Sequence, residues 1–409
     1  MVSPPTNAKP ALVLSGGGAR AAYQVGVLKA LAEILPEGAG NPFPIICGTS
    51  AGAINAVTLA AFDGCFSDAV AELEGIWRSL EPGDVYRYGW WEVLRGARQV
   101  IGSLLNQGVG LERPIALLDN SPLRDLIRQH VHFERVDRAI ARGDLDAVSV
   151  TAMGYSSGQS VAFFQGRTDL KGWRRYRRIG RPALLNVDHL MASSAIPTLF
   201  PTTKIEYEYF GDGALRQLSP ISPALHLGAD RVFIIGVSGN RAPKAGQISR
   251  ARHSPSIAQV VGQMLNAAFV DSLEGDIEHL EKINRLVALI PREEREAAGL
   301  PLRKVSNQVI WPSEELDKIA GRKVRDLPSS LRLFLRSTGA TAAGGGSAAA
   351  SYLLFSPSFI NEVIALGYRD AMWEASAMRA FFTAPVEEGA NAPKPKRRRR
   401  KQKQTDASA

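Results

Sequence analysis

Two strand–turn–helix units follow one another at the start of the chain, and this arrangement limits the fold more than any other feature of the sequence. In the first unit, an apolar run at 11–14 is broken by Gly16–Gly18 and followed by helical spacing of apolar residues over 21–35. In the second, an apolar run at 44–47 ends in a turn at 48–52, and a helical stretch follows directly. Parallel strands joined by helical crossovers produce this order, so the sequence predicts an α/β fold around a mainly parallel sheet.

The middle of the chain is expected to add further strands. Residues 66–145 have a mainly helical pattern, and the apolar runs at 147–152 and 160–165 are joined by a turn sequence that predicts a hairpin. Two more strands are expected at 205–210 and 231–237, each bordered by glycine or by a short polar turn. These strands give the predicted sheet more members than the two N-terminal units alone would supply.

The C-terminal part has a weaker pattern. A long helical segment is expected over 255–290, with a strand-like end at 286–290, and an amphipathic helix is expected again over 351–382. These changes divide the chain into a tail at 1–10, a main domain at 11–290, a helical C-terminal extension at 291–384 and a disordered polybasic tail at 385–409.

The net charge of +9 comes mostly from the C-terminal tail. Eight basic residues lie within 394–403 and Asp406 follows them, so residues 391–409 carry +7 and the rest of the chain is nearly neutral. Charge therefore gives no argument that the folded body binds nucleic acid, and no specific nucleic acid is expected as a partner. The run at 394–403 is of the kind that contacts anionic membrane lipid peripherally or touches nucleic acid without specificity.

Several features favour a cytoplasmic protein. No stretch approaches the roughly 18 to 20 uninterrupted apolar residues of a membrane-spanning helix. Residues 1–10 lack the basic and apolar regions of a signal peptide, so export by that route is not expected. The two cysteines, Cys47 and Cys65, build no disulfide framework and are expected to be small apolar packing residues.

The turn at 48–52 reads Gly-Thr-Ser-Ala-Gly and matches the G-x-S-x-G pattern of a nucleophile elbow. In such an elbow the serine stands on a strained turn between a strand and a helix, and both flanking elements are predicted here. The other members of the pattern are Gly48, Thr49, Ala51 and Gly52. Ser50 is therefore the candidate nucleophile, and an ordinary strand-to-helix turn of small residues is the alternative.

The first glycine turn is a candidate oxyanion hole. It consists of Gly16, Gly17, Gly18, Ala19 and Arg20. Backbone amides in such a turn are unhindered and suit a phosphate or the oxyanion of an acyl-transfer intermediate. A nucleotide site is the rival interpretation, but Ala21 stands at the last position of G-x-G-x-x-G, and no lysine follows as a phosphate-binding loop requires.

A nucleophilic serine needs a base, and the chain offers two kinds. In the chain order of a Ser-His-Asp esterase, the histidine is one of His226, His253 and His279, but none follows a strand in a turn of small residues. Asp212 does, because Gly211-Asp212-Gly213-Ala214 comes straight after the strand at 205–210 and places the carboxylate between two glycines. A carboxylate held in a partly desolvated cleft can take a serine proton, although a plain Asp-Gly turn would have the same sequence.

Together and in this order, the segments Gly16–Arg20, Gly48–Gly52 and Asp212–Ala214 resemble the patatin-like phospholipase family, as does the run at 191–197. The resemblance extends from residue 11 to about residue 235. It implies a three-layer α/β/α sandwich, with 11–290 as the catalytic domain and 291–384 as a C-terminal extension. One departure is Ala21, since the family often has glycine at that position.

The resemblance also implies a function. The chain would hydrolyse carboxylic esters of lipids or phospholipids with a Ser–Asp dyad, without a metal or another cofactor. Ser50 would be the nucleophile, Asp212 the general base and the Gly16–Arg20 loop the oxyanion hole. The alternatives from other classes are a Ser-His-Asp esterase and a lipid- or nucleotide-binding protein without turnover.

Aromatic residues gather between the two motif regions. Tyr86, Tyr88, Trp90 and Trp91 are followed by apolar residues and interleaved with arginines. This composition suits a lid at a lipid–water boundary, and buried helix packing would look similar.

Overall fold

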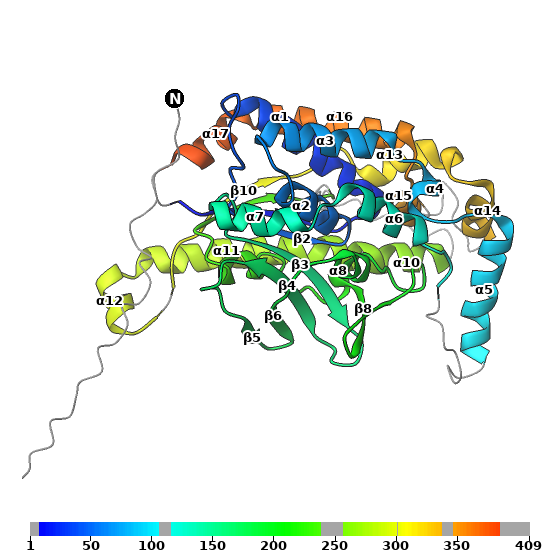
Figure 1. Cartoon of the computed structure of the whole chain (residues 1–409), viewed down its shortest axis with the longest axis horizontal. Coiled ribbons are helices and arrows are strands. Elements are labelled where there is room, and N and C mark those ends of the chain that lie inside the picture. Colours follow the sequence, from blue (N-terminus) through cyan, green and yellow to red (C-terminus); the bar gives the residue numbers. More distant parts are fainter. Residues whose placement is uncertain (1–7, 106–115, 239–256, 301, 338–346, 385–409) are drawn as a thin grey trace, which may run out of the picture.

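Ten strands in the described residues form one sheet through the centre of the protein (Figure 1). The computed structural model describes residues 8–105, 116–238, 257–300, 302–337 and 347–384. Its strands are β1 (Pro10–Leu14), β2 (Ile45–Thr49), β3 (Ala147–Gly154), β4 (Ser160–Gly166), β5 (Trp173–Arg175), β6 (Arg178–Pro182), β7 (Thr203–Ile205), β8 (Glu208–Asp212), β9 (Arg231–Ile235) and β10 (Ser306–Ile310).

The central part of the sheet is parallel, as the two N-terminal units predict. Strands β10, β9, β1, β2 and β3 lie side by side in that order, and every pair among them is parallel. The register pairs Leu12 with Ile46 on one side and with Phe233 on the other. Beyond β3 the sheet becomes mixed, because β4 and β8 both pair with β3 in antiparallel direction. The predicted hairpin of β3 and β4 is confirmed.

Helices cover both faces of the sheet. They are α1 (Ala22–Ile34), α2 (Ala51–Ala60), α3 (Phe66–Ser79), α4 (Pro82–Val85), α5 (Trp90–Leu105), α6 (Ser121–His130), α7 (Glu134–Arg142), α8 (Val187–Ser193), α9 (Ser222–His226), α10 (Ile257–Asn266), α11 (Ser272–Leu289), α12 (Arg292–Ala297), α13 (Leu316–Lys323), α14 (Ser329–Ser337), α15 (Ser347–Leu353), α16 (Pro357–Trp373) and α17 (Ala375–Thr383). In the described part of the chain, no helix combines the length and the apolar character needed to cross a bilayer.

The strand residues alternate between two apolar layers, as the period of two along a strand requires. Leu12 and Leu14 of β1 pack in the larger core, with residues of α1, α2, α3 and α16. Ala11 and Val13 point to the opposite face and pack with residues of α9 and α11. The chain therefore folds as a three-layer α/β/α sandwich, which confirms the predicted fold class.

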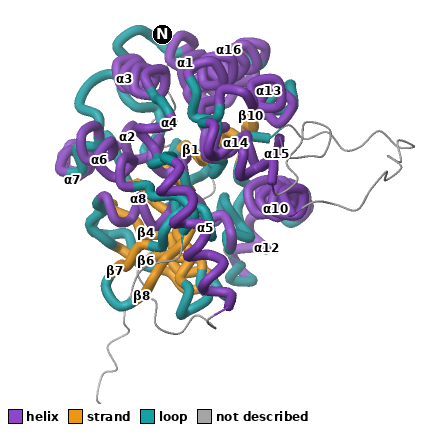
Figure 2. Tube along the Cα trace, turned by 90° about the vertical axis from the view of Figure 1, so that its right-hand side faces the viewer, coloured by secondary structure: helices purple, strands orange, loops and turns teal. Residues whose placement is uncertain are grey.

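The C-terminal helix α16 packs against α1 at the start of the chain (Figure 2). Two glycines permit this contact. A Cβ atom at Gly26 would clash with the carbonyl oxygen of Ile364, and one at Gly367 would clash with the carbonyl oxygen of Tyr23. The two backbones thus approach more closely than larger side chains would allow.

Three sequence expectations need correction. The strand expected at 205–210 is interrupted, because β7 ends at Ile205, a turn follows at 206–207 and β8 begins at Glu208. The end of the segment 255–290 is not strand-like, because α11 continues to Leu289. Strand β10 was not predicted, and it extends the parallel part of the sheet beside β9. The stretch 291–384 therefore supplies one strand of the central sheet in addition to its helices. The polybasic tail at 385–409 and residues 1–7 lie outside the described residues.

Candidate active site

Ser50 stands on a sharp turn between β2 and α2. Its backbone has φ 56° and ψ −131°, a left-handed conformation that is costly for a residue with a side chain. The turn is closed by small residues, because a Cβ atom at Gly48 would clash with Ala53 and one at Gly52 would clash with the carbonyl oxygens of Leu14 and Ser15. The local geometry is that of a nucleophile elbow.

Asp212 lies at the end of β8 and faces Ser50. The Ser50 Oγ donates a hydrogen bond of 2.6 Å to Asp212 Oδ2, although the two residues are far apart in the sequence. The other carboxylate oxygen, Oδ1, accepts from the amide of Ala214 at 2.9 Å. The Asp212 amide donates to the carbonyl of Ala195, which fixes the end of the strand. The structure thus brings together the predicted nucleophile and the predicted base.

Burial makes Asp212 a stronger base than an ordinary carboxylate. The residue is 0% exposed, and desolvation raises its pKa to about 7, against the smaller lowering effects of the hydrogen bonds from Ser50 and Ala214. A base with a pKa near neutrality is well matched to proton transfer at neutral pH.

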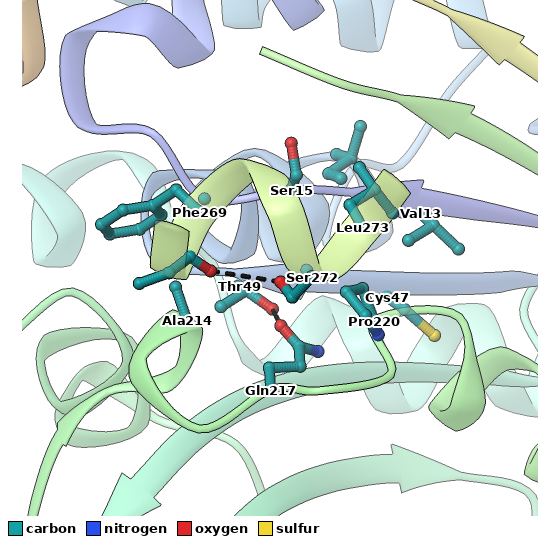
Figure 3. Close-up of a pocket in the computed structure, with 14 residues that line it drawn as sticks. Val13, Ser15, Cys47, Thr49, Ala214, Gln217, Pro220, Phe269, Ser272 and Leu273 are labelled. Atoms are coloured by element: carbon teal, nitrogen blue, oxygen red, sulfur yellow. Dashed lines mark hydrogen bonds between the residues drawn. The ribbon is translucent and has the colours of Figure 1, made fainter. Parts of the chain in front are cut away.

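A second layer of hydrogen bonds supports the elbow. The amide of Ser50 donates to Ser193 Oγ at 2.8 Å, and Ser193 Oγ donates to the carbonyl of Thr151 at 2.6 Å. On the other side, Thr49 Oγ1 donates to Gln217 Oε1 at 2.6 Å (Figure 3). Sequence reasoning did not single out Ser193 or Gln217. Ser193 belongs to the small-residue run at 191–197, which was the available signal for it.

The glycine turn lies directly beside the serine. A Cβ atom at Gly16 would come within 3.0 Å of the Cβ of Ser50 and 2.7 Å of the ring of Phe269, so a larger residue there would displace that ring. Within the described residues, the amide of Gly17 donates to no acceptor. Gly18 has φ 54° and begins a 3₁₀ turn that leads into α1. The Gly16 end of the turn therefore lies beside Ser50.

Ala19 and Arg20, the last two residues of the predicted oxyanion loop, contact other parts of the protein. Ala19 is fully buried in the core. The Arg20 amide closes the turn by donating to the carbonyl of Gly17 at 3.1 Å. The Arg20 side chain is 1% exposed and contacts residues of the C-terminal segment, among them Ser351 and Asp317.

A mainly apolar pocket opens onto Ser50. Together with its open mouth it spans about 750 Å³ of empty space. Its apolar walls come chiefly from α2, α3 and α6 and include Ile54, Leu73, Ile76, Trp77, Leu126, Ile127 and Phe200. The Ser194 hydroxyl also lines the pocket, and it is buried without a hydrogen-bond partner among the described residues.

His130 lines the apolar pocket, but no histidine in the described residues is hydrogen-bonded to Ser50. The imidazole of His226 lies 2.8 Å from the carbonyl oxygen of Ser222 and stacks on Trp173. His279 lies on α11 and has no hydrogen bond to Ser50. Burial lowers the pKa of His189 to about 4, and its ring caps the start of α8. His253 lies outside the described residues.

The aromatic cluster at 86–91 divides into a buried and an exposed part. Tyr86 is fully buried, and its hydroxyl donates to the carbonyl of Leu353 at 2.7 Å. Trp91 is 80% exposed and Trp90 is 50% exposed at the start of α5. Buried packing thus describes Tyr86, whereas Trp90 and Trp91 form an apolar surface on α5.

Comparison with known families gives one match. The family described as patatin-like phospholipase matches residues 12–225 of the chain, which include the glycine turn, Ser50 and Asp212. No curated protein matches the chain.

Several solved structures are similar to the chain at low identity. VipD from Legionella pneumophila is 13% identical, with 94% of this chain and 93% of VipD covered and a TM-score of 0.29. Human GIVD cytosolic phospholipase A2 in complex with methyl gamma-linolenyl fluorophosphonate is 11% identical, with 92% of this chain and 59% of that chain covered and a TM-score of 0.36. The type III effector protein ExoU is 16% identical, with coverages of 85% and 78% and a TM-score of 0.27. The family assignment rests on the match over residues 12–225.

Proposed function

Because this chain belongs to the patatin-like phospholipase family, we propose that it hydrolyses carboxylic ester bonds of lipids with Ser50 as nucleophile and Asp212 as general base. Membership of this family makes the chain a lipid hydrolase. The Ser–Asp dyad and the kind of ester are what we propose. The observation that carries it is the 2.6 Å hydrogen bond from Ser50 Oγ to a buried carboxylate whose pKa is raised to about 7. This pair combines a nucleophile with a base of suitable strength.

These groups supply each step of the proposed reaction. Ser50 Oγ attacks the acyl carbonyl carbon and passes its proton to Asp212 Oδ2. Amides of the Gly16–Gly18 turn stabilise the resulting oxyanion. The intermediate collapses to the acyl-enzyme, and the leaving alcohol takes the proton from Asp212. Water then attacks the acyl-enzyme with Asp212 as base, and the free fatty acid leaves with Ser50 restored.

The apolar pocket supports a substrate with an acyl chain. It adjoins Ser50, and Ile54, Leu73 and Ile127 are among its walls. An acyl chain in this space would exchange contact with water for contact with apolar side chains, which favours binding by about 0.8 kcal/mol per buried methylene. Phospholipids, lysophospholipids and acylglycerols all satisfy this requirement.

We also propose a cytoplasmic protein that contacts anionic membrane through residues 394–403. These residues lie outside the described part of the chain, and their charge is the reason for the proposal. Polybasic segments gain roughly 1 kcal/mol per basic residue near an anionic surface. The exposed Trp90 and Trp91 are a second candidate for the same contact, as a lid at the lipid surface.

A fluorophosphonate probe and a panel of esters test the proposal together. Wild-type protein is expected to be labelled covalently at Ser50 and to release fatty acid from short-chain esters and defined phospholipids. Ser50→Ala should fold normally and lose both properties, because loss of a nucleophile costs several orders of magnitude. Residual hydrolysis above about 1% of wild type would remove Ser50 from this role.

Wild-type protein that binds lipid or nucleotide but neither labels nor turns over would favour the binding-protein alternative. The third interpretation, a Ser-His-Asp esterase, is tested by the histidine variants described in the Discussion.

A further inference from the structure

The Arg20 side chain connects the glycine turn to the C-terminal segment. Its Nε donates to Ser351 Oγ at 2.7 Å, and its Nη2 forms an ion pair with the carboxylate of Asp317. The guanidinium also lies 4.0 Å from the centre of the Tyr352 ring. These three partners come from α13 and α15, about 300 residues after the turn along the chain.

The partners of Arg20 are themselves connected. Ser351 Oγ lies 3.1 Å from Asp317 Oδ1, and the Tyr352 hydroxyl donates to Asn266 Oδ1 at 3.1 Å. Asn266 in turn accepts from Arg20 Nη2 at 3.3 Å. A guanidinium that is 1% exposed depends on such a network, because a buried charge without a partner is strongly destabilising.

Helix α15 also touches the turn through its backbone. The carbonyl oxygen of Tyr352 sits where a side chain at Gly18 would project, and Gly18 has φ 54°. The Tyr352 side chain lines the apolar pocket that opens onto Ser50. The end of α15 is held in turn by Tyr86, whose hydroxyl donates to the carbonyl of Leu353. α15 therefore lies against both the glycine turn and the pocket.

We propose that the C-terminal segment completes the active site: α13 and α15 clamp the glycine turn through Arg20, so that its amides face Ser50. Asp317, Ser351 and Tyr352 are then positioning residues for the oxyanion hole. They lie outside residues 12–225, the part of the chain that matches the family. The inference rests on the proposed function, because it assigns the turn its role in that reaction.

Asp317→Asn tests the clamp, since it removes the charge on the partner of Arg20 and keeps the size of the side chain. The expected result is a fall in kcat of about 10- to 100-fold on a soluble short-chain ester with KM changed less than about threefold, because the damage is to transition-state stabilisation. Asp317→Glu should recover most of the activity. Ser351→Ala leaves the ion pair in place and should lower kcat by a smaller factor. This variant replaces Asp317→Asn in the test if Asp317→Asn does not fold.

Two inhibitors separate positioning from general structural damage. An alkyl trifluoromethyl ketone forms a hemiketal oxyanion with an active serine, whereas the matching methyl ketone mainly occupies the pocket. Asp317→Asn should weaken the binding of the trifluoromethyl ketone by about the same factor by which kcat falls. The binding of the methyl ketone should stay unchanged. Glu362→Gln is the matched control, because Glu362 pairs with Arg322 and Lys323 at 2.9 and 3.1 Å within the same segment. Its kcat and both inhibition constants should equal those of wild type.

The outcomes are distinct. If Asp317→Asn folds and has the kcat and both inhibition constants of wild type, the proposed clamp is wrong. It is also wrong if the variant binds both ketones more weakly by the same factor. Wild-type protein that neither hydrolyses esters nor binds the trifluoromethyl ketone contradicts the proposed function, and the clamp is then rejected with it.

Discussion

The amide of Ser50 donates a 2.8 Å hydrogen bond to the hydroxyl of Ser193, and this hydroxyl donates to the carbonyl of Thr151 at 2.6 Å. One hydroxyl from α8 thereby ties the elbow after β2 to the neighbouring strand β3. The left-handed backbone of Ser50 costs on the order of 1–3 kcal/mol and persists only where the surroundings fix it. Ser193 is one of the groups that do so.

Ser193→Ala should therefore lower both stability and activity. The substitution leaves a buried amide and a buried carbonyl without their partner, which costs about 1–3 kcal/mol in the free energy of unfolding. Urea denaturation measures this loss, and ester hydrolysis measures the accompanying fall in kcat. Ser194→Ala is the control for stability, because the Ser194 hydroxyl has no partner in the described residues. Equal stability of Ser193→Ala and wild type would contradict the prediction.

Asp212→Asn should cost far more activity than alanine at any histidine. The amide of asparagine cannot accept the Ser50 proton, whereas His226 is bonded and stacked away from the serine. Hydrolysis of a soluble ester by folded variants at His226, His253 and His279 provides the comparison. If one of these alanine variants were as inactive as Asp212→Asn, a Ser-His-Asp triad would replace the dyad.

The dependence of kcat/KM on pH should report the titration of Asp212. Only the ionised carboxylate can act as base, and burial raises the pKa of Asp212 to about 7. The activity is therefore expected to rise with pH up to a plateau just above neutrality, and to fall tenfold per pH unit on the acidic side. A profile that stays flat from pH 5 to 8 would be inconsistent with this base.

Asp212→Asn should also stabilise the protein above pH 7. The folded-state pKa of about 7 exceeds the unfolded value of 3.8, so stability is full below pH 3.8 and is lost as the pH rises through 7. Asparagine carries no charge and avoids this loss, which we expect to be on the order of 4 kcal/mol at pH 8 and to vanish towards pH 4. Unfolding at several pH values measures the difference. Asp169→Asn is the control, because Arg167 lowers the pKa of Asp169 and its substitution should give no such gain.

Truncation after Gly389 should weaken sedimentation with anionic vesicles and leave hydrolysis of a soluble ester unchanged. The removed residues carry the +7 charge, and the attraction should decline with added salt. Zwitterionic vesicles are the control and should bind both proteins equally. If truncated and full-length protein bound anionic vesicles equally at low salt, the prediction would be wrong. The exposed surface formed by Trp90 and Trp91 would then be the better candidate for the membrane contact.

The sequence predicted those parts of the site that local chemistry specifies. Ser50 could be found because the elbow needs glycines at fixed positions, and Asp212 because it follows a strand directly. Strand β10 was missed because Ser306–Ile310 is short and half polar, and it becomes a strand by pairing with β9. The bond of Ser193 to Ser50 and the burial of Arg20 against Asp317 arise from distant contacts that no local pattern encodes.

The packing of α1 against α16 also means that α1 is synthesised long before the helix that covers it. Gly26 meets its partner helix only after roughly 340 more residues have been translated, which takes on the order of tens of seconds at 5–20 residues per second. During that interval α1, which is apolar on most of its surface, lacks the helix that covers it. A nascent chain is then a natural client for chaperones, and its glycine turn at the start of α1 has no fixed support. We expect lipid hydrolysis to begin only after α13, α15 and α16 have all been synthesised.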